Sequence, residues 1–183
     1  IAGTRELAVL GGQSAFAEPL HVGAPSTGNR ERLLERINGA LDRRWLTNDG
    51  PLVRELEQRI ESLLGVRHCI AMCNGTVALE IGIRALGLEG EVIVPSMTFV
   101  ATAHSLQWQR ITPVFADIDP ATHNIAVERI EELITPRTTG IIGVHLWGRP
   151  CDVDALADLA RRHDLKLMYD AAHAFAVTLG GRG

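Results

Sequence analysis

The segment GEVIVPSMTFVATAHSLQWQRITPVFADID, residues 90–119, indicates the fold of the chain. It contains two short apolar runs, Glu91–Val94 and Thr112–Ala116, on either side of a helical pattern at Val100–Gln109. Both runs show little alternation of polar and apolar residues, which is typical of strands covered by helices on both faces. The segment therefore predicts one strand–helix–strand unit of a parallel sheet.

The same alternation of strand and helix patterns continues on both sides of this unit. Three further apolar runs predict strands, at Cys69–Met72, Thr139–Val144 and Leu165–Tyr169. Three further patterns predict helices, near Thr76–Leu86, Val127–Ile134 and Asp152–Arg162. We therefore expect an α/β fold with a mostly parallel sheet sandwiched by helices.

The first part of the chain shows no strand pattern. An arm that ends near Pro25 precedes a helix expected at Glu31–Arg44. After the turn sequence Asn48-Asp49-Gly50-Pro51, a second amphipathic helix is expected to end at Gly65. We divide the chain into an N-terminal arm and helix, residues 1–45, and the first part of an α/β domain, residues 46–183.

Composition excludes several classes of protein. The chain has 183 residues, a net charge of −4 and dispersed arginines, and Lys166 is its one lysine, so a nucleic-acid groove is not expected. No apolar run approaches the roughly 20 residues that span a bilayer, and the N-terminus predicts no signal peptide. The three cysteines lack the spacing of a metal site, and we expect reduced thiols in the cytoplasm.

Polar or aromatic residues follow each predicted strand. They are Asn74-Gly75-Thr76, Ser96 to Phe99, Asp117 with Asp119, His145 with Trp147, and Asp170 with His173. In open α/β sheets, ligands bind outside the carboxyl ends of the strands. These residues therefore predict a ligand site at that edge of the sheet.

The tripeptide Asn74-Gly75-Thr76 stands where a strand is expected to meet a helix. Free amides at a helix N-terminus bind anions, Gly75 permits close approach, and the Thr76 hydroxyl adds a donor, so a phosphate site is one interpretation. A helix cap with a flexible turn is the alternative. The glycine-rich motifs of dinucleotide-binding sites and of P-loops are absent from the sequence.

Three single residues are further candidates. Phe99 could stack on a planar ring or could pack beneath the sheet edge. Asp170 ends an apolar run, where a carboxylate is costly unless it meets a cation or strong donors. A protonated heterocyclic nitrogen would be such a partner, whereas a turn cap or an arginine pair is the alternative. His173 could reach the same site and stack on a ligand or bond its phenolic oxygen, or could be structural.

The remaining polar residues give weaker evidence for a functional role. We expect His145 and Trp147 to support the structure, and Asp119-Pro120 to open a turn. No GxSxG or HExxH motif occurs, which disfavours a hydrolase or a zinc site.

Taken together and in order, the motifs of this sequence resemble the DegT/DnrJ/EryC1/StrS family of sugar aminotransferases. The likeness runs from about Trp45 to the end of the chain. The motifs that carry it are Asn48 to Pro51, Asn74 to Leu79, Glu91 to Ser96, Thr98 to Thr102, Asp117 to Asp119, Ile134 to Thr138, Val144 to Gly148 and Asp170 to Ala174.

The resemblance implies a fold-type I aminotransferase large domain, pyridoxal 5′-phosphate as cofactor, and a homodimer with sites at the subunit interface. By motif, Gly75 and Thr76 would hold the cofactor phosphate, and Phe99 would stack on the pyridine ring. Asp170 would bond the pyridinium nitrogen. His173 stands where the family often has glutamine, near the phenolic oxygen of the ring.

Within the family, the sequence is most similar to dTDP-4-keto-6-deoxyglucose 4-aminotransferases of deoxysugar biosynthesis in antibiotic producers. This implies a nucleotide-linked 4-keto-6-deoxy sugar as substrate, a dTDP-sugar above all, and glutamate as amino donor. A pyridoxal phosphate-dependent sugar dehydratase of the same fold is one alternative. A non-catalytic fragment that binds a partner is another.

The resemblance also implies a Schiff-base lysine downstream of Gly181-Arg182-Gly183, where the sequence stops. Lys166 cannot replace it, because it is expected at the start of a strand, away from the site. We therefore expect that the rest of the large domain and the small domain are absent from this sequence.

Overall fold

The computed structural model describes residues 3–18, 21, 23 and 25–181, which fall into two compact units, Ile1–Gly50 and Pro51–Gly183. The division lies inside the predicted turn Asn48 to Pro51. Residues Arg182 and Gly183, where we expect the next hairpin of the family to begin, lie outside the described residues.

The first unit contains two short 3₁₀ turns, η1 (Thr4–Glu6) and η2 (Ala8–Leu10), and the helix α1 (Arg30–Arg43). The Asn29 side chain caps α1 by accepting from the Arg32 amide at 2.9 Å, and Arg44 ends it in a left-handed conformation. The predicted helix is confirmed to within one residue. Its apolar stripe, made of Leu33, Leu34, Ile37 and Leu41, is exposed along its length.

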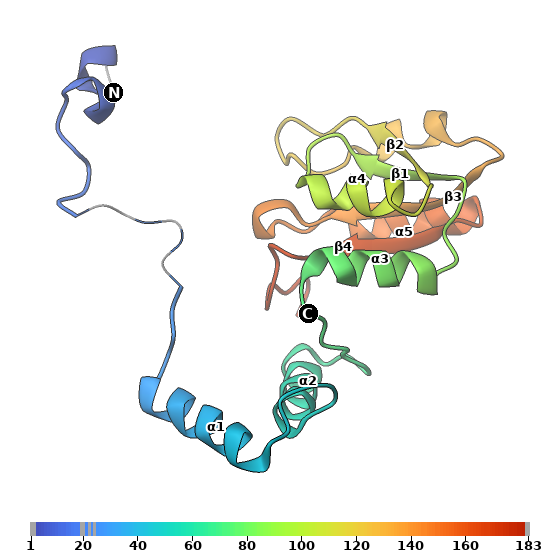
Figure 1. Cartoon of the computed structure of the whole chain (residues 1–183). Helices are drawn as coiled ribbons and strands as arrows, with labels where there is room; N and C mark the ends of the chain where they lie inside the picture. Colours follow the sequence, from blue (N-terminus) through green and yellow to red (C-terminus); the bar gives the residue numbers. More distant parts are fainter. Residues whose placement is uncertain (1–2, 19–20, 22, 24, 182–183) are drawn as a thin grey trace. The chain divides into compact units, whose positions relative to one another are not determined.

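The second unit is built on a sheet of four parallel strands in the order β2-β1-β3-β4 (Figure 1). The strands are β1 (Glu91–Pro95), β2 (Thr112–Ala116), β3 (Thr138–Val144) and β4 (Lys166–Asp170). All five residues of β1 are buried, as expected for a central strand with both faces covered. The predicted parallel sheet is confirmed.

Helices cover both faces of this sheet. On one face, Val92 and Val94 of β1 pack in a cluster with Ile83 of α3 (Gly75–Ala85) and Leu106 of α4 (Val100–Gln107). On the other face, Ile93 packs with Leu156 and Leu159 of α5 (Val153–Arg162). Successive strand residues therefore serve opposite cores, and Figure 1 shows the same three-layer arrangement.

The predicted strand at Cys69–Met72 is wrong, because these residues are irregular and no described strand pairs with them. Two of their amides are instead bound by carboxylates of α2 (Pro51–Leu64). The Cys69 amide donates to Glu61 at 3.0 Å and the Ala71 amide donates to Glu57 at 2.8 Å. A strand forms only against a neighbouring backbone, which apolar composition cannot supply.

The predicted helix at Val127–Ile134 is also wrong. The segment forms two 3₁₀ turns, η3 (Val127–Arg129) and η4 (Glu131–Leu133), with the fully buried Ile130 between them. Ile134 is already extended, and Pro136 disfavours helical geometry at the residue before it. The stretch is thus too short to become a stable α-helix.

The order of the strands creates a crevice. The connection from β1 to β2 uses α4 on one face, whereas the connection from β3 to β4 leads the opposite way and uses α5 on the other face. The chain direction across the sheet therefore reverses between β1 and β3. Such a switch point leaves a ligand crevice at the carboxyl ends of these two strands.

Candidate functional site

A cavity of about 230 Å³ lies at the carboxyl ends of β1, β3 and β4. Its lining includes all five predicted site residues, namely Gly75, Thr76, Phe99, Asp170 and His173. They come from the start of α3, the segment before α4, the last residue of β4 and the loop after it. The structure thus brings together residues that span almost a hundred positions in the sequence.

At the start of α3, one residue caps the helix and the next two have amides without a partner among the described residues. The Asn74 side chain accepts from the Val77 amide at 2.9 Å and so caps the helix. The amides of Gly75 and Thr76 have no acceptor within the described part of the chain. A Cβ atom on Gly75 would meet nothing within 4 Å, so packing does not require glycine here. The predicted cap is therefore confirmed at Asn74, and two amides remain that could receive an anion.

Asp170 is held by two hydrogen bonds at the mouth of β4. Its Oδ2 accepts from the Thr102 hydroxyl at 2.9 Å, and its Oδ1 accepts from the Ala172 amide at 3.1 Å. Each carboxylate oxygen keeps a further lone pair, and the residue lines the cavity. The arginine pair considered from the sequence does not occur among the described residues, whereas the turn cap does.

Phe99 presents its ring to the cavity. It occupies the N-cap position of α4, makes no side-chain capping bond and is 67% exposed. The alternative of packing beneath the sheet edge is therefore wrong. An exposed aromatic ring at a cavity wall can stack on a planar ligand.

The loop that contains Trp147 orients His173. The Trp147 amide donates to Nδ1 of His173 at 3.2 Å, and Trp147 has the left-handed conformation (φ 53°, ψ 28°) that turns this amide. A ring nitrogen that accepts a hydrogen bond carries no proton, so in this tautomer Nε2 is the donor. His173 can therefore donate one hydrogen bond to an oxygen in the cavity.

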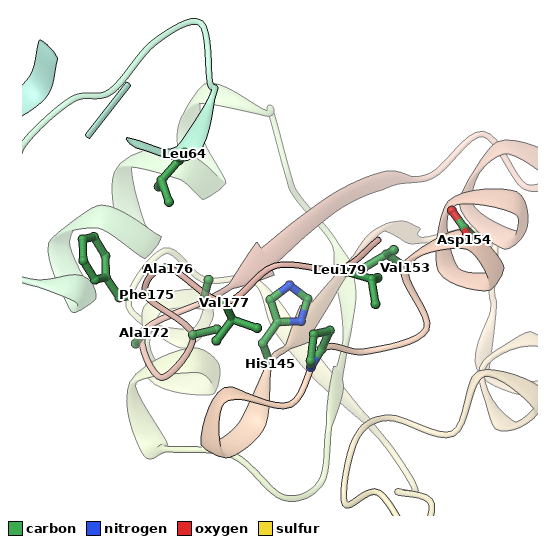
Figure 2. A pocket seen from close by; sticks show the side chains of 12 residues that line it. Leu64, His145, Val153, Asp154, Ala172, Phe175, Ala176, Val177 and Leu179 are labelled. Carbon is green, nitrogen blue, oxygen red and sulfur yellow. The ribbon is translucent and has the colours of Figure 1, made fainter. Parts of the chain in front are cut away.

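His145 belongs to a second, larger cavity of about 660 Å³, which Figure 2 shows. This cavity is mostly apolar, with Val153, Phe175 and Leu179 in its wall, and it contains none of the five predicted site residues. The His145 ring stacks on Tyr169 with centroids 5.0 Å apart, and its Nδ1 accepts from the Cys151 amide. Burial lowers the pKa of His145, which fits the structural role expected for it.

Asp119, the second of the two acids after β2, serves a turn. Oδ1 of Asp119 accepts from the amides of Ala121 at 2.7 Å and Thr122 at 2.9 Å, and these bonds lower the pKa of Asp119. The predicted turn is therefore confirmed. Across residues 3–18, 21, 23 and 25–181, no group of three histidine, cysteine or acidic side chains could hold a metal ion. Nor is any helix in those residues long and apolar enough to cross a membrane.

Lys166 and Asp170 stand at opposite ends of β4, as the sequence predicted. Four steps of about 3.3 Å put their Cα atoms roughly 13 Å apart along the strand. Lys166 is exposed at the amino end of β4, and it does not line the cavity.

Thr98 lies in the segment Ser96 to Phe99 that was predicted to border the site, whereas Thr102 was not among the predicted site residues. Their hydroxyl oxygens lie 2.8 Å apart, and Thr102 connects them to Asp170. Thr98 precedes the N-cap of α4 and Thr102 lies in its first turn, and this spacing of four residues across a helix start is the only signal in the sequence that could have suggested the pair.

Residues 28–183 match the DegT/DnrJ/EryC1/StrS aminotransferase family, and the chain belongs to this family. Among curated relatives, the dTDP-4-amino-4,6-dideoxy-D-glucose transaminase of Shigella dysenteriae is 45% identical over 160 residues. This match covers 87% of the chain and 44% of the relative, so the chain spans less than half of the length of such proteins.

Solved structures agree with the family assignment. The crystal structure of DesI in the presence of its TDP-sugar product has a TM-score of 0.90 and 52% identity, and the match covers 98% of this chain and 46% of DesI. The structure of NtdA from Bacillus subtilis with bound cofactor PMP has a TM-score of 0.78 and 35% identity, and covers 81% of this chain and 34% of NtdA. The expected fold-type I architecture is thus confirmed. The family and these neighbours indicate dependence on pyridoxal phosphate.

Proposed function

We propose that the protein to which this chain belongs transfers an amino group to a nucleotide-linked 4-keto-6-deoxy sugar, with pyridoxal 5′-phosphate held in the 230 Å³ cavity. One observation carries the proposal. Asp170, with two donors already on its carboxylate, shares the cavity with the unpaired amides at the start of α3. An acid and an anion site on one small cavity match a ligand with a cationic ring nitrogen and a phosphate.

The residues present fit this cofactor. The amides of Gly75 and Thr76, together with the Thr76 hydroxyl, would receive the phosphate, because the open space at Gly75 lets an oxygen come close to the backbone. Phe99 would cover one face of the ring and keep water from it. His173 would donate from Nε2 to the phenolic oxygen, since its Nδ1 is already an acceptor.

Asp170 would have the central chemical role. When bound, the cofactor supplies an electron sink for the amino-transfer reaction. Asp170 would hold a proton on the ring nitrogen, because an ionised carboxylate at hydrogen-bond distance favours the charged form of its partner. The bonds from Thr102 and Ala172 keep the carboxylate pointing at the cavity, so no reorientation is needed during the reaction.

The substrate, donor and assembly are further parts of the proposal. The names of the Shigella transaminase and of the DesI complex support a dTDP-sugar substrate, and we propose glutamate as the amino donor. We also propose a homodimer, as the resemblance to the family implies. Three free cysteines support a reducing compartment such as the cytoplasm. We further propose a role in the deoxysugar biosynthesis of antibiotic producers.

Substitution of Asp170 by alanine in the full-length protein tests the proposal. Titration with pyridoxal 5′-phosphate, followed by absorbance, should show at least tenfold weaker binding, and turnover should fall more steeply than binding. Asp158→Ala is the matched control, since Asp158 makes only an exposed pair with Arg161 on α5. Near-normal binding and turnover in Asp170→Ala would reject the assignment.

Borohydride reduction gives an independent check on the placement of Lys166. Peptide mapping after reduction with the cofactor should find no label on Lys166, because this side chain starts β4, at the end remote from the cavity. A stable adduct on Lys166 would contradict the proposed site.

A further inference from the structure

The side chain of Thr102 is fully buried, with 0% of the residue exposed, yet it carries a hydroxyl group. Its Oγ1 donates to Oδ2 of Asp170 at 2.9 Å, across 68 positions of sequence. The bond connects α4 on one face of the sheet to the carboxyl end of β4. Valine has almost the same shape as threonine, so filling this space does not require a hydroxyl.

The number of protons gives the hydrogen bonds a direction. A threonine hydroxyl has one proton, and Thr102 uses it on Asp170, which as a carboxylate can only accept. The 2.8 Å contact between Thr98 and Thr102 must therefore be a bond that Thr98 donates. The chain of donors runs from Thr98, which lines the cavity, through Thr102 to Asp170.

The Thr102 hydroxyl and the Ala172 amide hold different oxygens of the same carboxylate. Two bonds to two oxygens fix both the position and the rotation of the carboxylate plane, whereas either bond alone would leave rotation free. Only the lone pairs that face the cavity then remain for a ligand.

We propose that Thr102 is a positioning residue that aims Asp170 at the ring nitrogen of the cofactor, and that Thr98 orients the Thr102 hydroxyl. The inference rests on the proposed function, because it concerns the carboxylate that this function uses. Thr102 touches neither cofactor nor substrate and acts only through Asp170.

The test compares two probes on three proteins, each at full length. The probes are pyridoxal 5′-phosphate and its 1-deaza analogue, in which a C–H group replaces the ring nitrogen. The proteins are the unchanged protein, Thr102→Val and Thr102→Ser. Thr102→Val should weaken binding of pyridoxal 5′-phosphate about tenfold and leave binding of the analogue within about twofold. Thr102→Ser, which keeps the donor, should restore binding of the natural cofactor.

Equal weakening of both probes in Thr102→Val, or no restoration by serine, would overturn the inference, since either result indicates a general packing defect. Asp170→Ala separates this failure from failure of the proposed function. Should Asp170→Ala distinguish the two probes while Thr102→Val does not, only the role of Thr102 is wrong. Should Asp170→Ala bind both probes like the unchanged protein, the proposed function itself is wrong.

Thr98→Val keeps the inference testable if Thr102→Val does not fold. Thr98 lies at the cavity wall and is only partly buried, so valine there is tolerated more readily. We expect about threefold weaker binding of pyridoxal 5′-phosphate and unchanged binding of the analogue. Unchanged binding of both probes would overturn the inference that Thr98 donates to Thr102 and thereby orients the bond from Thr102 to Asp170.

Discussion

The backbone amide of Trp147 donates a hydrogen bond to Nδ1 of His173, 26 residues further along the chain, at 3.2 Å. The bond assigns the ring proton to Nε2, so His173, which lines the cavity, has one donor left for a ligand. Gly148, which follows Trp147, is left-handed (φ 80°), and a Cβ atom there would lie 3.1 Å from the His173 carbonyl oxygen. The loop after β3 is thus closely fitted to the loop after β4.

A glutamine at position 173 should function almost as well as histidine. Its side-chain carbonyl can accept from the Trp147 amide while its amino group donates to the cavity. We expect His173→Gln to bind pyridoxal 5′-phosphate within about twofold of the unchanged protein. His173→Phe should bind about fivefold more weakly, because one hydrogen bond of about 1 kcal/mol is lost. Spectral titration measures both, with His163→Gln at the C-cap of α5 as control. Equal affinity in His173→Phe would contradict the prediction.

Gly75 and Gly140 should respond to alanine in opposite ways. Gly75 has open space around its Cβ position, so Gly75→Ala should keep the free energy of unfolding or raise it by up to about 1 kcal/mol. It should nevertheless weaken binding of pyridoxal 5′-phosphate about tenfold, since the methyl group blocks the approach to the amides.

Gly140 is the structural counterpart. A Cβ atom there would lie 2.9 Å from the Lys166 carbonyl oxygen on the paired strand, so Gly140→Ala should lower stability by about 1–3 kcal/mol. Urea denaturation and cofactor titration on both variants check the contrast. Unimpaired cofactor binding by Gly75→Ala means that the phosphate lies elsewhere.

Loss of Arg137 should destabilise the sheet. Arg137 and the Thr135 hydroxyl both bond the Glu91 carboxylate, whose side chain is 7% exposed at the start of β1. Arg137→Ala leaves a buried carboxylate short of a partner, which should cost about 1–3 kcal/mol of unfolding free energy. Arg161→Ala removes a similar pair from an exposed position and should cost less than about 0.5 kcal/mol. Chemical denaturation compares the two, and equal losses would show that Glu91 needs no cation.

The buried thiol of Cys151 should make the free energy of unfolding depend on pH in the alkaline range. Burial raises the pKa of Cys151 from its ordinary value of 9.0 to about 11. Between these values the unfolded chain releases the proton while the folded chain keeps it. The contribution of this thiol to the free energy of unfolding is therefore fully present below pH 9 and falls as the pH rises toward 11. Each pH unit in this window costs at most about 1.4 kcal/mol for the one proton.

Cys151→Ala should therefore lose less stability than the unchanged protein when the pH of a urea titration is raised from 8 to 10. Burial raises the pKa of Tyr169 to about 12, and the charge of Cys151 contributes to this shift, so the loss of Cys151 also reduces the contribution of Tyr169 and acts in the same direction. Cys73→Ala is the control, because Cys73 is exposed. Parallel losses in all three proteins would show that the Cys151 thiol ionises freely in the fold.

Local pattern was sufficient for the strands that have a neighbour in this chain. The runs at Glu91–Val94 and Thr112–Ala116 became β1 and β2 because each has an apolar composition and a parallel partner. The run at Cys69–Met72 has a similar composition but no described partner, and carboxylates of α2 bind its amides instead. Pairing is a property of two segments, so one segment cannot predict it.

The gathering of the five candidate site residues around one cavity was predictable for a related reason. Each stands directly after an apolar run or at a helix start, and parallel strands bring their carboxyl ends to one edge whatever their separation in the sequence. Thr102 was not predictable, because a threonine within a helix shows no sign of the side chain that it will meet. Its partner Asp170 is 68 positions away.

The sequence by itself determined the four strands of the sheet, the helices that cover it, and which family the chain resembles, because these depend on periodicity, capping and short motifs. Only the tertiary structure decided that Thr102 holds Asp170, that the Trp147 amide orients His173, and that no strand forms at Cys69–Met72. The physical reason is that hydrogen bonds act over about 3 Å. Which donors and acceptors come that close depends on how the layers pack and in what order the strands lie.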